Sequence, residues 1–392
     1  MSVSVAGEAS REEGVLLLED GSCFRGWLAS PGKRFGEVVF NTSMTGYQEI
    51  LTDPSYCGQI VLMTQPHIGN YGTYAAAEES ERPRVEGFVA REFTEVPSGI
   101  EGRPLIAYLK QHGIPALAGI DTRAVVRRLR QKGALRGVIA SAADDREQLL
   151  AEVLAMPEMQ GRALVDEVTC VEEYELPADG DEIAFLAVYD FGVKRNILRS
   201  LCGAGARLRV LPARTPASRC DELGVDGVVL SNGPGDPEPL HEIIANVRQL
   251  ADSGRPLLGI CLGHQLLGLA MGGSTFKLKF GHHGGNQPVR DLDDGTVAIT
   301  AQNHGFALAG DSLPGNCRVT SVNLNDGTVE GFEVEGAPIF SVQYHPEAAP
   351  GPHDASRLFA AFLEAVRRQG SGAGRGAGDA PGEAASERPA AG

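Results

Sequence analysis

A cysteine between two glycines is the residue of this sequence best placed for covalent chemistry. The stretch "RPLLGICLGHQLLGLAMG" sets Cys261 between Gly259 and Gly263, after a short apolar run and before an apolar segment with helical spacing. This spacing is typical of a nucleophile elbow, a strained turn between a strand and a helix that presents a reactive side chain. The helix start stabilises a thiolate, and the backbone N–H of Leu262 would face a developing oxyanion. The alternative is a small buried residue at a strand-to-helix turn, but the two glycines and the polar His-Gln pair favour the nucleophile.

A nucleophilic cysteine needs a base, and the segment "SVQYHPEAAPGPHD" offers one. His345 precedes a proline, which favours an extended backbone, and in an extended chain Glu347 projects to the same side. A carboxylate in that position can fix the imidazole tautomer, as the third member of a triad does. The alternative is a solvated loop that carries an unrelated His and Glu. His264, next to the nucleophile, is a rival base, but its place in the first helical turn should direct its side chain away from the sulfur.

Two glycine-containing loops could complete a pocket around the cysteine. "SNGPGDP" follows the apolar run "GVVL", and loops at the carboxyl ends of parallel strands line the ligand crevice of an open sheet. Gly233 and Gly235 of this loop can offer backbone N–H groups without obstruction by side chains. "QNHGFA", residues 302–307, suits contacts to a small polar substrate. Each pattern, taken alone, is also that of an ordinary turn.

Metal and nucleotide sites are not predicted in this chain. His282 and His283 in "GHHGGN" are adjacent on a glycine-rich loop without nearby Cys, Asp or Glu, which makes a poor metal site. The sequence contains no G-x-x-x-x-G-K-[ST] phosphate loop and no G-x-G-x-x-G after a strand. We therefore expect neither a metal nor a bound nucleotide cofactor.

Charge and composition exclude several classes of protein. The formal charge of −16 argues against a nucleic-acid or anionic-membrane surface, since both need clustered Lys and Arg. No apolar run reaches the ~18 residues of a membrane span, and the N-terminus lacks the pattern of a signal peptide. The seven cysteines are dispersed and form no C-x-x-C pair, which indicates reduced thiols and a cytoplasmic setting.

The elements that must position these residues predict an α/β protein of two domains. Short strand-like runs, including a hairpin around Asp20-Gly21, and helices over 103–113 and 121–133 predict a mixed α/β domain over 1–150. An acidic stretch places a linker at 151–182. Over 183–368, four apolar runs alternate with helical stretches, which predicts a doubly wound, largely parallel sheet covered on both faces. The low-complexity tail, 369–392, should be disordered.

Several motifs, taken together, resemble a known family. "GICLGHQ", "SNGPGDP", "QNHGF" and "HPEA" resemble the class I glutamine amidotransferases, which use a Cys-His-Glu triad. "VVFNTSMTGYQEILTDPSY", "DFGVKRNILR", "KFGHHGGNQPV" and "HPEAAPGPHD" resemble the small subunits of carbamoyl-phosphate synthase. This resemblance covers about residues 14 to 368 and makes the second domain a glutamine amidotransferase domain.

The resemblance implies a reaction and a set of site residues. Glutamine would be hydrolysed to glutamate and ammonia through a thioester on Cys261, with His345 as general base and acid and Glu347 orienting it. The N–H groups of Leu262 and Gly233 would hold the oxyanion. Glutamine contacts are implied for Ser55, Gly233, Gly235, Leu262, Gln265, Asn303, Gly305 and Phe306. Because Ser55 belongs to the first domain, the pocket should close between the domains.

The resemblance also implies a partner. Ammonia would pass to a large subunit, in a heterodimer or higher oligomer, that makes carbamoyl phosphate from bicarbonate and ATP for arginine and pyrimidine biosynthesis. ATP and Mg²⁺ (or Mn²⁺) are expected on that subunit. A stand-alone cysteine hydrolase of the γ-glutamyl peptidase type is the alternative, and the whole first domain, unnecessary for such an enzyme, argues against it. A catalytically silent scaffold is disfavoured by the intact triad.

Overall fold

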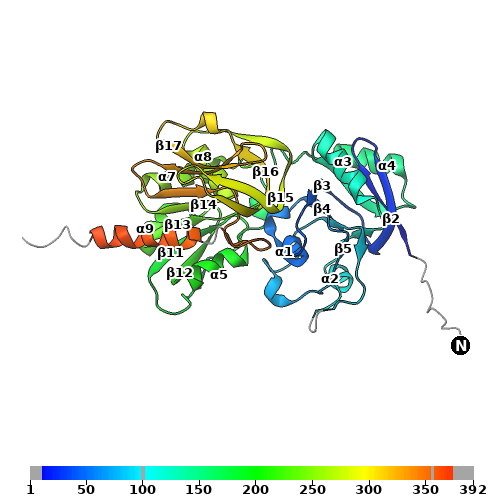
Figure 1. Ribbon diagram of the computed structural model, residues 1–392, viewed down its shortest axis with the longest axis horizontal. Helices are drawn as coiled ribbons and strands as arrows, with labels where there is room; N and C mark the ends of the chain where they lie inside the picture. The colour runs from blue at the N-terminus through cyan, green and yellow to red at the C-terminus, as the bar shows by residue number, and fades with distance from the viewer. Residues whose placement is uncertain (1–10, 99–101, 355–356, 374–392) are drawn as a thin grey trace, which may run out of the picture.

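The computed structural model describes residues 11–98, 102–354 and 357–373 and shows two domains joined end to end (Figure 1). The N-terminal domain, blue to cyan, is built on a closed barrel, and the C-terminal domain, green to red, on one large sheet. Residues 374–392 of the predicted disordered tail lie outside the described residues. Of the helices that the structure describes, none combines the length and apolar character that crossing a bilayer requires.

The barrel closes in the order β1-β2-β8-β6-β4-β3-β9. Apolar side chains from alternate positions of its strands fill the interior, such as Leu16, Val38, Ile60 and Ile139. The barrel strands are β1 Glu13–Leu18, β2 Cys23–Ser30, β3 Arg34–Asn41, β4 Gln59–Met63, β6 Gly87–Val89, β8 Ala116–Ala118 and β9 Leu135–Ser141; β5 His67–Ile68 and β7 Glu92–Phe93 form a separate pair.

Helices pack against the barrel, and the two predicted ones are confirmed. The helix predicted over 121–133 is α3, Thr122–Lys132: the side chain of Asp121 accepts a hydrogen bond from Ala124 N, and Gly133 ends the helix with a φ of 105°. The helix predicted over 103–113 is α2, Leu105–Gln111. The other helices of this domain are α1 Tyr47–Thr52 and α4 Arg146–Ala155.

The C-terminal sheet has ten strands in the order β10-β12-β11-β13-β14-β19-β18-β17-β15-β16. Its centre, from β12 to β19, is parallel, as the alternation of apolar runs with helices predicts. From β18 to β16 the pairing is antiparallel, because tight turns rather than helices connect these strands. The strands are β10 Tyr174–Leu176, β11 Ala184–Asp190, β12 Ala206–Pro212, β13 Gly227–Leu230, β14 Leu257–Ile260, β15 Thr275–Asp291, β16 Val297–Leu308, β17 Cys317–Asn323, β18 Val329–Val334 and β19 Ile339–Val342.

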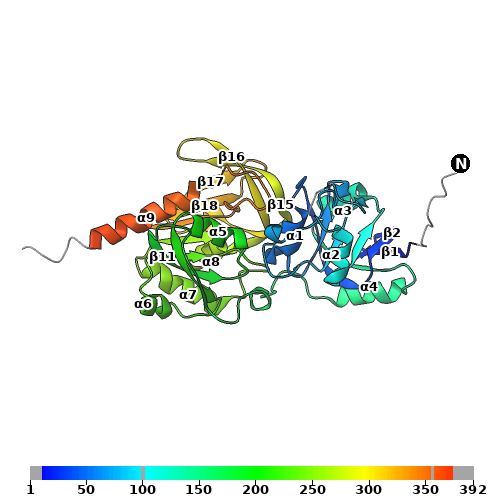
Figure 2. The same ribbon diagram turned by 90° about the horizontal axis from the view of Figure 1, so that it is seen from below.

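Helices cover both faces of the parallel part, which makes the sheet doubly wound (Figure 2). Apolar side chains of α5 Arg195–Gly203 and α9 Arg357–Ala373 pack on one face. Those of α6 Ser218–Leu223, α7 His241–Asp252 and α8 Leu262–Ala270 pack on the other. The central strands β13 and β14 are apolar and buried along their whole length, because both faces are covered.

Parts of the predicted linker and tail are structured. Helix α4 extends past residue 150, and Tyr174–Leu176 pair with β12 as an edge strand. Helix α9 continues to Ala373, so the chain is helical for a few residues beyond the predicted start of the tail. The edge strand pairs with a strand of the sheet, and the other two segments continue helices. Composition alone does not reveal either arrangement.

Backbone hydrogen bonds join the two domains. Thr42 N donates to His283 O at 3.1 Å, and Ala134 N donates to Lys279 O at 2.8 Å, so β15 lies against the barrel (Figure 1). On the other side of the interface, Arg195 N donates to Glu79 O at 3.0 Å.

Candidate active site

Cys261 lies in the turn between β14 and α8. Its φ of 53° and ψ of −103° are a backbone conformation that residues other than glycine rarely adopt. Such backbone strain clusters at functional sites. Cys261 N donates to Val342 O at 2.9 Å, which ties the turn to β19. Leu262 is the first residue of α8, so its N–H has no partner within the helix. The structure therefore has the elbow that the sequence predicts.

The glycines beside the cysteine are required by close packing of backbone. A Cβ on Gly259 would lie 2.8 Å from Gly263 O, and a Cβ on Gly263 would lie 2.2 Å from Leu230 O. At Gly233, a Cβ would lie 2.2 Å from Phe191 O. Only glycine lets the elbow approach the neighbouring strands this closely.

His345 is held by Glu347 and turned to the cysteine. Its Nδ1 lies 2.7 Å from Glu347 Oε1, while its buried Nε2 has no hydrogen-bond partner among the described residues. Burial alone would lower the pKa of His345, but the Glu347 carboxylate, with a smaller contribution from the Cys261 thiol, raises this pKa to about 10. The imidazole thus keeps a proton at neutral pH.

Lys194, which no sequence motif predicted as a site residue, also contacts Glu347. Its Nζ donates to Glu347 Oε1 at 2.8 Å, and both side chains are buried. Burial alone would raise the pKa of Glu347, but Lys194 and His345 lower it to about 2, so the carboxylate stays ionised. The only signal in the sequence was a lysine just after the carboxyl end of an apolar strand, inside the motif "DFGVKRNILR".

A single cavity contains Cys261 and nearly all the predicted glutamine contacts. Its lining includes Ser55, Gly233, Gly235, Gln265, Asn303, Gly305 and Phe306; of the predicted contacts, Leu262 is not among the lining residues. Gln59, Met159, His283 and His304 also line it and were not predicted. Met159 comes from the predicted linker, which is fastened to the Gly235 loop because Asp236 N donates to Arg162 O at 3.0 Å.

Hydrogen bonds across the domain interface build one wall of the cavity. Asn232 Nδ2 donates to Ser55 Oγ at 2.8 Å, and Asn303 Nδ2 donates to Asp53 Oδ2 at 2.9 Å. The Cys261 thiol in turn lies 3.7 Å from Asn303 O. The first domain therefore contacts the residue that holds the thiol.

The remaining histidines of the sequence analysis point elsewhere. His264 Nδ1 lies 2.9 Å from Ser341 Oγ, and its ring packs on Phe332, so it is not directed at the sulfur, as predicted. His283 Nδ1 lies 2.8 Å from Asn303 Oδ1 at the edge of the cavity. His282 points to the other side of β15, where Asp326 Oδ2 lies 2.8 Å from its Nε2.

Comparison with known proteins identifies the family. Residues 187–365 match "Glutamine amidotransferase class-I", and residues 16–139 match "Carbamoyl-phosphate synthase small chain, CPSase domain". The carbamoyl phosphate synthase small chain of Syntrophotalea carbinolica is 51% identical over 368 residues, covering 90% of this chain and 98% of the relative. The chain belongs to the carbamoyl-phosphate synthase small-chain family.

Other relatives agree with this assignment. The carbamoyl phosphate synthase small chains of Salmonella typhimurium and Thermosynechococcus vestitus are 49% and 51% identical, over 371 and 369 residues. Each match covers 90% of this chain, and 97% and 96% of the respective relative. The prediction of a glutamine-hydrolysing carbamoyl-phosphate synthase subunit is confirmed by this membership, and the stand-alone hydrolase is not favoured.

Proposed function

We propose that Cys261, His345 and Glu347 carry out the glutamine hydrolysis of this family. The single observation that carries the assignment is the buried line from Lys194 through Glu347 to His345, whose imidazole interacts with the strained Cys261. The Cys261 thiolate would attack the side-chain carbonyl carbon of glutamine, and the oxyanion would accept hydrogen bonds from the N–H groups of Leu262 and Gly233.

His345 would then move the protons of both half-reactions. The C–N bond breaks as His345 donates its proton to the departing ammonia, leaving a glutamyl thioester on Cys261. His345 next takes a proton from water, which attacks the thioester carbon and releases glutamate. Glu347, kept ionised by Lys194, stabilises the imidazolium in each step.

The small-chain names of the relatives support a large subunit as partner. We propose that ammonia passes to this subunit, which would hold ATP and Mg²⁺ (or Mn²⁺) and form carbamoyl phosphate from bicarbonate. All seven cysteines are free thiols, which supports a reducing, cytoplasmic setting.

The test measures glutamate released by the full chain, alone and titrated with the large subunit, ATP and bicarbonate. Cys261→Ser should abolish glutamate release but keep carbamoyl phosphate synthesis from added ammonium, since the large subunit uses free ammonia. His345→Asn should lower turnover by roughly 10²-fold or more, as loss of a general acid–base does, whereas His264→Asn should have a smaller effect. Near wild-type hydrolysis by Cys261→Ser, or no response to the large subunit, would contradict the proposal.

A further inference from the structure

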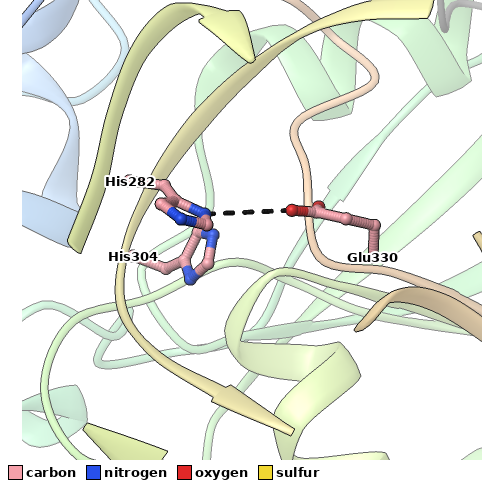
Figure 3. Close-up of side chains that lie close together, drawn as sticks. All are labelled: His282, His304 and Glu330. Carbon is pink, nitrogen blue, oxygen red and sulfur yellow. Dashed lines mark ion pairs between the residues drawn. The ribbon is translucent and has the colours of Figure 1, made fainter. Parts of the chain in front are cut away.

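Behind the cavity, His282, His304 and Glu330 meet from three strands, as Figure 3 shows. All three are buried, Glu330 completely, and their ligand-type atoms lie within 4.8 Å of one another. This composition suits a metal ion, but the amide of Gln302 lies among them. Its Oε1 is 3.0 Å from His282 Nδ1 and 3.1 Å from His304 Nε2. The side chains therefore converge on an amide that links them, and a hydrogen-bond network fits the cluster better than a metal cage.

The protons of this network can be assigned from His304. Its Nδ1 lies 2.7 Å from Phe306 O, and a carbonyl only accepts, so Nδ1 carries a hydrogen. Burial, with the neighbouring histidines, lowers the pKa of His304 well below its usual value, so the ring is neutral and Nε2 is an acceptor. The group that Gln302 presents to Nε2 must then be its N–H, which turns the amide oxygen away from the histidines.

The turned amide oxygen needs a donor of its own. The nearby Thr300 hydroxyl already donates to Gln287 O at 2.9 Å. Glu330 also interacts with Gln302. Its Oε1 accepts from Asn323 Nδ2 at 2.9 Å, and its buried Oε2 has no hydrogen-bond partner in the part of the chain that the structure describes. A hydrogen on the Glu330 carboxyl would supply the donor that the turned amide oxygen needs.

This network reaches the substrate cavity through one carbonyl. Phe306 O accepts from His304 Nδ1 and also from Gln265 Nε2 at 2.7 Å. Gln265, His304 and Phe306 all line the cavity with Cys261. The His304 tautomer with a hydrogen on Nδ1 thus holds the Phe306 carbonyl, which in turn accepts a hydrogen bond from Gln265.

We propose that Glu330 is a positioning residue for glutamine binding, which in its protonated form sets the His304 tautomer through Gln302. The inference rests on the proposed function of the cavity. Ionisation of Glu330 would remove the donor that Gln302 needs, release the His304 tautomer and weaken the glutamine pocket, so the KM for glutamine would rise at alkaline pH.

The charges around Glu330 agree with a protonated carboxyl. Burial is the main cause that raises the pKa of Glu330, to about 8, and Asp326 adds to it, while Asn323 and Gln302 oppose it. His282 Nδ1 lies 3.9 Å from Glu330 Oε1, but its Nε2 faces Asp326. Burial raises the pKa of the Tyr344 phenol, and Glu330 adds to this, so the phenol is neutral beside the carboxyl.

The test compares the full chain with its Glu330→Gln variant, each with the large subunit, between pH 6 and 9. Glutamine has an N–H that can donate in place of the carboxylic O–H and cannot ionise. The wild-type KM for glutamine should rise roughly tenfold by pH 9, as expected when a group with a pKa near 8 must stay protonated, with kcat little changed relative to the variant. The KM of Glu330→Gln should stay flat. Glu335→Gln, at an exposed position next to β18, is the matched control and should follow the wild type.

A second measurement does not depend on activity. Between pH 4.5 and about 8 the unfolded chain ionises this carboxyl while the native chain keeps it protonated, so the wild type loses stability as pH rises and Glu330→Gln does not. The unfolding temperature of the wild type should therefore fall relative to that of Glu330→Gln from pH 6 to 8, and the difference should then stay constant.

Three outcomes are decisive. Superimposed KM profiles for the wild type and Glu330→Gln would overturn the proposal. Stoichiometric zinc in the purified wild type, lost in Glu330→Gln, would replace it with a metal site. Failure of the wild type itself to hydrolyse glutamine would instead refute the function proposed for the cavity, independently of Glu330.

Discussion

At the residue scale, the site depends on charges that stabilise one another out of water. Lys194, Glu347 and His345 are buried, and each would be costly there alone. Glu347 Oε1 accepts hydrogen bonds from both neighbours, at 2.8 Å from Lys194 Nζ and 2.7 Å from His345 Nδ1. The lysine thus acts on the imidazole through the carboxylate.

Replacing Lys194 with Met should weaken catalysis most at acidic pH. Without the lysine, burial raises the pKa of Glu347 from about 2, so the carboxylate becomes protonated at mildly acidic pH and no longer stabilises the imidazolium. We expect kcat/KM for glutamine to fall by roughly tenfold or more, with the acid limb of its pH profile moved upward. Lys33→Met, which removes a lysine from the half-exposed pair with Glu152, is the control and should leave the profile unchanged. A Lys194→Met profile of wild-type shape would show that Glu347 does not need the lysine.

At the element scale, the position of the proposed nucleophile, Cys261, follows from how α8 packs against the sheet. Gly263 N donates to Ser231 O at 3.0 Å, so the first turn of α8 is bonded to the end of β13. The loop that follows β13 carries Gly233, and the turn before α8 carries Cys261. This one contact therefore sets the distance between the sulfur and a proposed oxyanion donor.

Gly263→Ala should separate these two elements. Its Cβ would lie 2.2 Å from Leu230 O, and backbone on both sides leaves only movement of α8 to relieve the clash. We expect a loss of about 1–3 kcal/mol in the free energy of unfolding, as for other overpacked sites, together with a large fall in kcat. Gly203→Ala in α5, where the nearest atom would lie 4.0 Å away, is the matched control and should be neutral or stabilising. Urea unfolding and glutaminase assays measure both effects; equal behaviour of the two variants would contradict the packing argument.

At the scale of the whole molecule, the N-terminal domain contacts the cavity beside the proposed triad of the other domain. Asp53 and Ser55 form hydrogen bonds with Asn303 and Asn232. The charges of Asp53 and Glu79 also act on Lys194, which directly precedes α5. The cavity is completed only when the two domains are docked. Rates at such a site depend on the relative placement of the domains, which a docked partner can adjust.

Asp53→Asn should report on this placement. The change removes a carboxylate that holds Asn303, whose backbone oxygen lies next to the Cys261 thiol, and removes a negative charge that stabilises the Lys194 ammonium. We expect kcat/KM for glutamine to drop by roughly tenfold or more, the scale of a misplaced catalytic group. Asp20→Asn, in a barrel turn bonded to Arg128, is the control and should retain activity. Unchanged kinetics of Asp53→Asn would mean that Asn303 is positioned by the second domain without help from the first.

Features that depend on local spacing can be predicted from the sequence alone. Glycine two residues on either side of Cys261 predicts the elbow, because only glycine fits where backbone touches backbone. His345 and Glu347, two residues apart in an extended segment, share a side of the chain and do form their hydrogen bond. The capped helix after Asp121 and the parallel core of the sheet follow from similarly local patterns.

Which distant residues meet depends on how the elements pack in three dimensions. Lys194 and Glu347 are 153 residues apart, and Asp53 and Asn303 are 250 apart. The antiparallel half of the sheet, the edge strand in the linker and the Glu330 network likewise depend on packing between elements. Local spacing sets the direction of a side chain from its own element. Its partner, in contrast, depends on how whole elements pack to bury their apolar faces. A lysine beside a strand therefore has the same local pattern whether or not a carboxylate lies across from it.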